Sequence, residues 1–477
     1  MSASREKKIR QEQAAAGHID PKVEREAKRR AEQRRTSVLY GCIAAAFVIA
    51  AAFILLWNSN IIQRGAAAYT IGEETYTAAD VDFYTHAIYN EYYANYGSYA
   101  SSFFTADSLL EQALERMHNT VALAAKAINA GYEFTDEMRQ HVDDTLATID
   151  GYAATNGYSR AKYLKMVYGP LMTEEVFLRH TTFAEYAAVY TDDYTSSLDY
   201  SEEDFAAAYA ENPADYDSVD IEFILFSAMV ESADTADAEI EAAMEEAKKK
   251  AEEAQLHYAA GESLEAIAEE LGGEYSHSPY TSSGTSEMLT WAFADERMPG
   301  DVTVVKYSDK GGYYLVVFHS RARNDYHSVD VRHILINVEN GDDAAALAKA
   351  EELLADWEKN GASEEYFAEL ADSNSADTAT VGIGGLYASV SRGQMVDEFE
   401  AWCFDEARAA GDTGIVYDST YDGYHVMYFV GENDLPYWQE KLTTELTAAD
   451  YDEWLASVKA EYPAQKESGI KYATKLV

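Results

Sequence analysis

The spacing of apolar residues changes along the chain. Residues 38–57 form an apolar run without a charge, whereas residues 78 to about 210 repeat apolar side chains at helical spacing, with breaks near glycines. Later segments, among them residues 328–336 and 421–429, are short apolar runs typical of strands. The pattern predicts one helix of membrane length, then a helical domain, then α+β structure.

The strand-like runs belong to an internal repeat with an offset of 110 or 111 residues. The matching pairs, in chain order, are residues 218–226 with 328–336, Trp291 with Trp402, and residues 312–318 with 423–429. Three matches in the same order indicate a duplicated domain. Each copy reads as strand, helix, short helix, loop, helix, strand and strand. This order predicts a small, mostly antiparallel sheet covered by helices.

The two copies differ at two strand positions. Phe223 and Tyr314 in the first copy stand where the second copy has His333 and His425. Histidine is costly inside an apolar strand, because its ring nitrogens need hydrogen-bond partners once water is excluded. The first copy is also shorter before its tryptophan, and we expect it to lack both the glycine-rich and the Gly-Gln-Met stretches of the second. The first copy is therefore predicted to be catalytically empty.

A glycine pair and a Gly-Gln-Met turn lie between the two histidines. They are Gly384-Gly385 and Gly393-Gln394-Met395, and Phe399 follows one helical turn after Met395. In this order and spacing the second copy resembles a parvulin-type peptidyl-prolyl cis-trans isomerase, and the first copy resembles the same family weakly. The resemblance implies rotation about X-Pro bonds, a reaction that breaks no bond and requires no metal and no cofactor.

The resemblance also implies roles for single residues. Met395, Phe399 and Gln394 stand where the family binds substrate, the first two as the pocket for the proline ring. Asp377 falls where the family carries Asp or Cys, and Thr420 falls where it carries a hydroxyl near the second histidine. The implied catalytic group is thus His333, Asp377, Thr420 and His425.

Two departures from the family pattern bear on activity. Where the family usually shows Gly-Gly-Asp-Leu-Gly, the chain has Leu386 and Tyr387 after the glycine pair. Asp422 replaces a small polar residue, and we expect this carboxylate to lie beside His425 and to raise its pKa. Taken alone, a strand histidine is more often a structural residue, and a Met/Phe pair at helical spacing more often belongs to a core.

The charge is unevenly distributed over the 477 residues. The formal net charge is −47, yet residues 1–36 hold 11 Lys and Arg against 6 Asp and Glu, a net of +5. The rest holds 26 against 78, a net of −52. Binding to nucleic acid needs clustered cations, so the acidic body argues against a nucleic-acid partner.

The uncharged run has the length of a transmembrane helix at about 1.5 Å per residue. Five basic residues from Lys28 to Arg35 precede it, and the positive-inside rule then places the N-terminus in the cytoplasm and the later domains outside. Cleavage after residues 66–68 is the alternative, but the run exceeds the roughly 7 to 15 apolar residues of a signal peptide. Lipidation of Cys42 is disfavoured, because the apolar run follows this cysteine. Cys42 and Cys403 are not expected to pair.

The predicted helical domain is rich in tyrosine. These rings either line a groove for unfolded chains or, as is commoner, serve core and surface packing. The residues in question include Tyr89, Tyr92, Tyr93, Tyr96 and Tyr99.

Together these features predict a multidomain α+β protein with a single N-terminal transmembrane helix, an α-helical chaperone-like domain, two tandem parvulin-like domains and a C-terminal helix. The segments are a basic leader (1–36), an anchor (37–57), a helical SurA-N-like domain (66–215), a degenerate parvulin-like domain (216–322), a parvulin-like isomerase domain (326–432) and a C-terminal helical segment (433–477).

This layout resembles exported foldases of the PrsA and SurA type. The resemblance implies a membrane-anchored isomerase and chaperone that acts outside the cell on unfolded or newly exported polypeptides. The alternative is a non-enzymatic holdase in which both copies only bind extended chains. Client identity and oligomeric state stay open.

Overall fold

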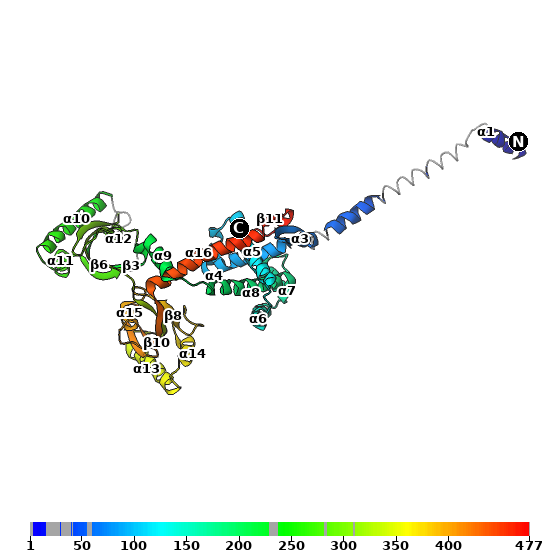
Figure 1. Cartoon of the computed structure of the whole chain (residues 1–477). Coiled ribbons are helices and arrows are strands. Elements are labelled where there is room, and N and C mark those ends of the chain that lie inside the picture. Colours follow the sequence, from blue (N-terminus) through cyan, green and yellow to red (C-terminus); the bar gives the residue numbers. More distant parts are fainter. Residues whose placement is uncertain are drawn as a thin grey trace. The chain divides into compact units, whose positions relative to one another are not determined.

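The computed structural model describes residues 3–15, 29, 40, 42–54, 60–228, 237–280, 284–308 and 311–476 (Figure 1). The chain divides into two compact units. We call Met1–Leu198 together with Asp450–Val477 the helical unit, and Asp199–Ala449 the sheet unit.

Helices dominate the helical unit. Its elements are α1 (Ala3–Ala15), α3 (Ile61–Gly65), β1 (Ala67–Ile71), β2 (Glu74–Thr77), α4 (Ala78–Tyr96), η1 (Gly97–Phe103), α5 (Ala106–Asn129), α6 (Asp136–Thr155), α7 (Arg160–Tyr168), α8 (Glu174–Ser196), the last part of α16 (Tyr437–Glu461), β11 (Ala464–Lys466) and η3 (Ser468–Tyr472). Thr77 and Asp80 form the capping box that begins α4. The core joins apolar side chains of β1, α4, α5 and α8.

The predicted anchor, residues 37–57, is described only in part. Residues 40 and 42–54 are helical and exposed, and the others lie outside the described residues. Among the residues that are described, no helix combines the length and the apolar character needed to cross a membrane. The anchor therefore stays a prediction.

The C-terminal residues are part of the helical unit. β11 pairs antiparallel with β1, which also pairs with β2. On α16, Leu455 and Val458 are buried against side chains of α5 and α8. Trp454 stacks on Tyr194 with ring centroids 4.1 Å apart. The end of the chain thus completes the core that its N-terminal half begins.

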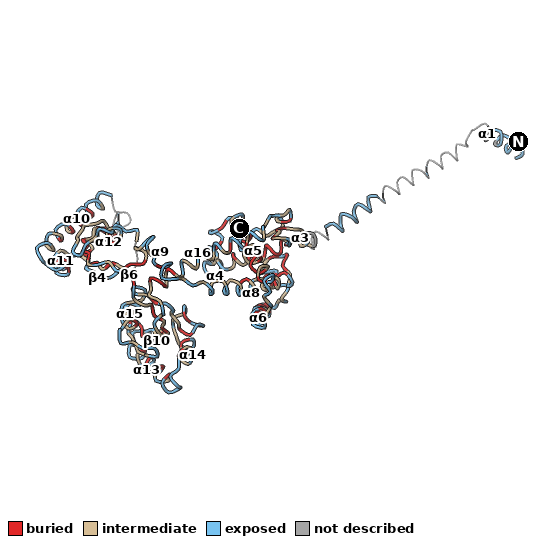
Figure 2. Tube along the Cα trace, viewed as in Figure 1, coloured by how far each residue is buried: buried red, intermediate tan, exposed pale blue. Residues whose placement is uncertain are grey.

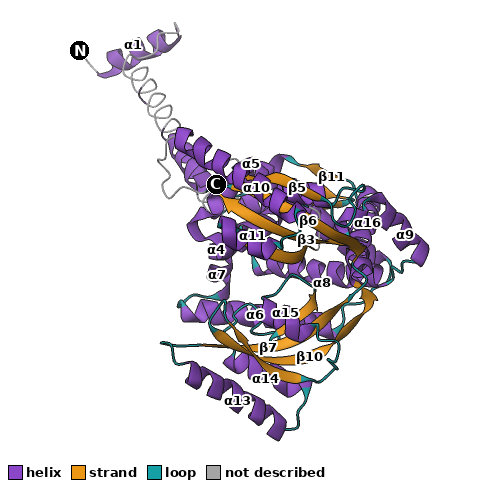
Figure 3. Ribbon diagram, turned by 90° about the vertical axis from the view of Figure 1, so that its left-hand side faces the viewer, coloured by secondary structure: helices purple, strands orange, loops and turns teal. Residues whose placement is uncertain are grey.

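The sheet unit contains two four-stranded antiparallel sheets (Figure 3). The first copy consists of β3 (Asp217–Ser227), α10 (Asp237–Ala259), α11 (Leu264–Leu271), β4 (Glu274–Tyr280), α12 (Glu287–Ala292), β5 (Val302–Ser308) and β6 (Gly312–Arg323). The second consists of β7 (His327–Asn337), α13 (Asp343–Lys359), α14 (Glu364–Asn374), β8 (Leu386–Val390), α15 (Asp397–Cys403), β9 (Thr413–Asp418) and β10 (Gly423–Pro436). α9 (Glu202–Glu211) and η2 (Pro213–Asp215) precede both.

The two sheets have equivalent strand orders, β4-β3-β6-β5 and β8-β7-β10-β9. Their central strands also pair in the same register, because Phe223 lies opposite Val316 as His333 lies opposite Met427. This register matches the offsets of the sequence repeat. The two copies are therefore one architecture built twice.

The central strands of each sheet, β3 with β6 and β7 with β10, hold most of its buried residues (Figure 2). Successive strand residues point to opposite faces, so Val331 packs in the cluster that contains Phe399 of α15, whereas Ile334 packs with α13 and α14. In the first copy, α12 covers one face, and α10 and α11 cover the other. His333 lies two residues after Val331 and therefore faces α15.

The position of the missing stretch differs from the prediction. Only Gly272 and Gly273 link α11 to β4, whereas residues 375–385 link α14 to β8 in the second copy. The first copy does keep α12, and Met288 of this helix stands at the repeat position of Phe399. The segment missing from the first copy thus lies between α11 and β4. The prediction that the first copy also lacks the counterpart of the Gly-Gln-Met stretch before α15 is wrong.

Candidate active site

Two histidine rings lie stacked next to α15. His333 on β7 and His425 on β10 face the same side of the sheet, and their Nδ1 atoms are 2.9 Å apart. The ring centroids are 5.2 Å apart at an interplanar angle of 25°. Both residues are buried, with 2% and 7% of their surface exposed. Two histidines far apart in the sequence thus form one buried pair.

A carboxylate lies at each end of the pair. His333 Nε2 donates to Asp377 Oδ2 at 2.8 Å, while His425 Nε2 lies 3.4 Å from Asp418 Oδ2. A neutral imidazole has one donor and one acceptor nitrogen, so His333 Nδ1 accepts from His425 Nδ1–H. In this arrangement His425 Nε2 carries no hydrogen, and the Asp418 carboxylate that it faces also only accepts. Two acceptors repel each other, which accounts for the 3.4 Å between them.

Burial keeps both rings neutral. Desolvation lowers the pKa of His333 to about 4, although the hydrogen bond to Asp377 acts in the opposite direction. Desolvation also lowers the pKa of His425, against the opposing effect of Asp418. At neutral pH both rings are therefore uncharged, and each carries a single N–H.

Asp377 is the charged group of the site. Besides the bond from His333, its carboxylate accepts from Thr380 Oγ1 and from the Tyr387 hydroxyl, both at 2.9 Å, and from Ala379 N–H at 3.0 Å. Burial alone would raise its pKa, but these hydrogen bonds outweigh burial and lower the pKa to about 2. The side chain is 15% exposed, so an ionised carboxylate reaches the surface beside the histidines.

The glycine pair holds the Asp377 loop against β7. His333 N–H donates to Gly385 O at 2.9 Å. A Cβ on Gly385 would lie 2.3 Å from His333 O, and a Cβ on Gly384 would lie 2.5 Å from Ala368 Cβ. Both glycines have φ of +68°, a conformation that side chains disfavour. The close approach explains why this loop needs glycine at both positions.

The predicted substrate-binding residues separate into two environments. Phe399 is 2% exposed, and its ring stands edge-on to both imidazoles, with centroids 5.7 Å from His333 and 5.3 Å from His425. Met395, half-buried in the turn before α15, packs on the same apolar cluster. Gln394 is exposed, and its Oε1 accepts from Ser391 N–H at 3.0 Å. Phe399 thus contacts the histidines and shares an apolar cluster with Met395, while Gln394 closes its own turn.

The surroundings of His425 differ from the prediction. The Thr420 side chain is exposed, and its backbone N–H donates to Asp418 Oδ1 at 2.7 Å. Asp422 is also exposed and accepts from the Tyr417 hydroxyl at 2.9 Å. The carboxylate next to His425 is that of Asp418, and the expectation that Asp422 raises the pKa of His425 is wrong.

Three residues of this network were not anticipated as site residues. They are Asp418, Thr380 and Tyr387. Strand alternation could have indicated Asp418, because this residue lies two positions after Val416 on β9 and therefore on the same face of the sheet. Val416 packs in the cluster around Phe399. Thr380 lies in the loop that carries Asp377, whereas Tyr387 lies on β8. Both meet Asp377 only through the course of this loop, which no sequence period describes.

Among the described residues, one group of three possible metal ligands occurs, formed by His257, Glu262 and Glu270 of the first copy. Glu262 and Glu270 are exposed, and His257 Nδ1 is within 3.2 Å of a Glu262 carboxylate oxygen. The group does not include the histidine pair. The expectation of a reaction without metal or cofactor stays a prediction.

Two parts of the chain match known family models. Residues 313–431 match the family model described as the PPIC-type PPIASE domain, which covers the second copy with its histidine pair. Residues 30–182 match the model described as the SurA-like N-terminal domain. Among curated proteins no significant match is found.

Three solved structures are similar to parts of the chain. A peptidylprolyl isomerase (PrsA) from Bacillus cereus is 25% identical with a TM-score of 0.19, over 28% of this chain and 49% of that chain, so the chain spans about half of its length. The corresponding PrsA from Bacillus anthracis is 15% identical over 72% of this chain and 94% of that chain, with a TM-score of 0.19. The foldase protein PrsA from Streptococcus pneumoniae is 13% identical over 85% and 97%, with a TM-score of 0.26.

Proposed function

The chain carries a parvulin-type peptidyl-prolyl isomerase domain and a SurA-like N-terminal domain, and we propose that it is a membrane-anchored, extracytoplasmic foldase. In this proposal residues 326–432 isomerise X-Pro bonds of unfolded, newly exported polypeptides, and residues 66–215 hold them. Residues 37–57 are the anchor, and residues 216–322 are a copy without activity. The observation that carries the proposal is the buried histidine pair, with Asp377 and Phe399 in direct contact with it.

Catalysis here means binding the twisted amide better than either planar form. The barrier to rotation is roughly 18 to 20 kcal/mol and arises from the partial double bond, which places negative charge on the carbonyl oxygen. Met395 and Phe399 would hold the proline ring in a dry apolar wall. The ionised Asp377 would disfavour the charge-separated planar form, so the twisted state gains relative stability.

The histidines would act as positioning residues in this mechanism. His333 fixes the Asp377 carboxylate through a 2.8 Å hydrogen bond, and both rings support the face of the site next to Phe399. His425 holds His333 in the tautomer that donates to Asp377. Thr420 contributes through its backbone, which orients Asp418 at the far end.

Client holding would use exposed aromatic side chains of α4 and η1. More than half of the surface of each of these rings is exposed, and they are Tyr93, Tyr96, Tyr99 and Phe103. Exposed aromatic groups bind apolar segments of unfolded chains at little cost in side-chain entropy. They also support the alternative function, a holdase without isomerase activity.

Two assays on the full-length chain, purified in detergent, distinguish the isomerase from the holdase. We expect accelerated cis-trans exchange of a proline peptide, followed by NMR, and suppressed aggregation of an unfolded test protein. Suppression without acceleration would establish the holdase and refute the isomerase.

The proposed topology has its own test. Expressed with its full leader, the chain should sediment with membranes, and external protease should digest the domains after residue 57 in intact spheroplasts. Recovery in the soluble fraction, or protection of these domains, would contradict the proposed location.

A further inference from the structure

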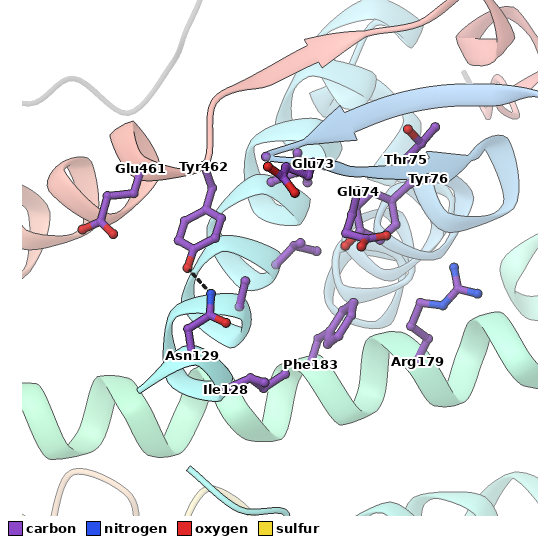
Figure 4. A pocket seen from close by; sticks show the side chains of 14 residues that line it. Glu73, Glu74, Thr75, Tyr76, Ile128, Asn129, Arg179, Phe183, Glu461 and Tyr462 are labelled. Atoms are coloured by element: carbon purple, nitrogen blue, oxygen red, sulfur yellow. Dashed lines mark hydrogen bonds between the residues drawn. The ribbon is translucent and has the colours of Figure 1, made fainter. Parts of the chain in front are cut away.

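The helical unit contains a cleft that is separate from the isomerase site. Its volume is about 890 Å³, within the range of pockets that bury several side chains of a ligand (Figure 4). The hairpin β1–β2 forms one wall, α5 and α8 form the opposite side, and the end of α16 closes it. All these elements belong to the one compact unit.

The floor of the cleft is apolar. It is lined by Val121 and Ile128 of α5 and by Phe183 of α8. Ile128 is 44% exposed, so a large aliphatic side chain faces solvent inside a concave site. Exposed apolar surface of this kind gains free energy when another apolar side chain covers it.

The rim is acidic, and two of its carboxylates are uncompensated. Glu73 and Glu74 are exposed, and within the described part of the chain neither has a basic partner. The other charges of the rim are paired internally: Arg179 lies 3.0 Å from Asp80, and Glu461 lies 2.6 Å from Lys126. A cationic ligand is therefore the one that this rim favours.

One wall of the cleft is a strand edge. β2 is an outer strand of the sheet β11-β1-β2, and Glu74, Thr75 and Tyr76 of this strand line the cleft. An edge strand offers backbone N–H and C=O groups to an added extended peptide, which is how several peptide-binding domains work. Backbone pairing fixes the conformation of such a ligand but not its sequence.

We propose that this cleft binds an extended segment of the client in which an apolar side chain is flanked by Lys or Arg. The apolar side chain covers Ile128 and Phe183, and the flanking cation meets Glu73 or Glu74. No proline is required, so the site retains segments that the isomerase domain does not recognise. The inference rests on the proposed foldase function and specifies a substrate class for the client-holding part.

Fluorescence anisotropy with two labelled, proline-free nonapeptides tests the charge preference on the full-length protein. One alternates Lys with Leu, and the other has Glu in place of every Lys. We expect the Lys peptide to bind about tenfold more tightly. The double variant Glu73→Gln/Glu74→Gln should lose about tenfold in that affinity, and the matched pair Glu133→Gln/Glu137→Gln, exposed outside the cleft, should lose less than twofold.

A second pair of variants tests the floor. Ile128→Ser should weaken binding of the Lys peptide several-fold, whereas Met166→Ser, which removes a comparably exposed apolar side chain on α7, should not. Both variants should retain isomerase activity, because neither residue lies in that domain.

Several results would overturn the inference. Equal losses in the cleft pair and the control pair would mean that the acidic surface attracts the peptide without a site. A concentration-dependent dimer that disappears in the cleft variant would place a second copy of the chain there. Aggregation suppression unaffected by the cleft variants would refute the cleft while leaving the foldase intact. A chain inactive in both the isomerase and aggregation assays would instead refute the proposed function.

Discussion

The two parvulin-like copies share a framework outside the site. Gly300 N–H donates to Phe318 O at 2.8 Å, and at the same point of the second copy Gly411 N–H donates to Phe429 O at 2.8 Å. A guanidinium covers the tryptophan in both, at 4.9 Å from the Trp291 centroid in the first and 4.0 Å from the Trp402 centroid in the second. These contacts are common to both copies.

The copies differ at the strand pair beneath the short helix. Phe223 and Tyr314 contact edge-on with centroids 5.1 Å apart, nearly the 5.2 Å that separates the stacked histidines. The sheet therefore accommodates an apolar pair in the same space. The first copy also lacks a loop equivalent to residues 375–385, which supplies Asp377. The histidines occur where a carboxylate partner exists, and this indicates a function beyond folding.

Replacing the histidine pair of the second copy by the Phe/Tyr pair of the first should have the largest effect on activity. In His333→Phe/His425→Tyr we expect kcat/KM for a proline peptide to fall by about two orders of magnitude, because Asp377 loses the ring that fixes it. Stability should fall by about 3 kcal/mol, since Asp377 and the buried Asp418 lose partners. NMR exchange of the peptide and hydrogen exchange of β10 measure the two effects.

The reverse transfer is the control for this swap. Phe223→His/Tyr314→His places two imidazoles in the first copy, where no loop brings a carboxylate. Isomerase activity should stay unchanged, and the domain should lose stability because it buries unsatisfied nitrogens. A swap in the second copy that left kcat/KM within twofold would remove the histidines from the mechanism.

The next largest effect that we expect is a loss of stability of the second copy in acid. The unfolded chain protonates His333 near pH 6.5, whereas the folded chain does so near pH 4. The depressed pKa means that the second copy loses stability as the pH falls from 6.5 to 4, by about 3 kcal/mol in total, and gains nothing further above pH 7. Asp377, with its pKa lowered from 3.8 to about 2, continues the loss in the same direction.

Histidine NMR and unfolding of the His333→Phe variant test this pH dependence. The His333 ring signal should not titrate above pH 5, and the variant should show a flatter stability profile than the wild type between pH 6.5 and 4. A His333 midpoint near 6.5 would show that burial does not control this ring.

Asp418 and Asp422 show which parts of the site could be predicted from the sequence and which could not. The sequence predicted both histidines inside strands, and the family resemblance placed them in one catalytic group. The partner of His425 depended instead on where β9 ends and on the turn that follows, in which Asp422 adopts a φ of +52° and bonds to Tyr417. Turn geometry of this kind arises from local backbone conformation, which alternation does not encode.

Phe399→Met tests the short helix with a smaller change. Met288 occupies this position in the first copy, where it is buried, so the substitution should cost less than about 1.5 kcal/mol of stability. We expect kcat/KM to fall about tenfold, because the ring that touches both imidazoles is lost. Met288→Leu is the matched control and should leave the rate unchanged. Equal rates for Phe399→Met and wild type would show that the ring is core alone.

The smallest effect concerns the shared framework. Arg297→Ala and Arg408→Ala each remove a cation over a tryptophan, a contact worth about 1 kcal/mol. Arg408 Nε also donates to Trp402 O at 3.1 Å, whereas within the described structure the buried Arg297 Nε has no hydrogen-bond partner. Arg408→Ala should therefore destabilise its copy more, by up to about 1 kcal/mol. Hydrogen exchange of β6 and β10 at constant pH compares the two, and a larger loss from Arg297→Ala would contradict this order. Isomerase activity should change less than twofold in either variant, because both arginines belong to the framework that the two copies share.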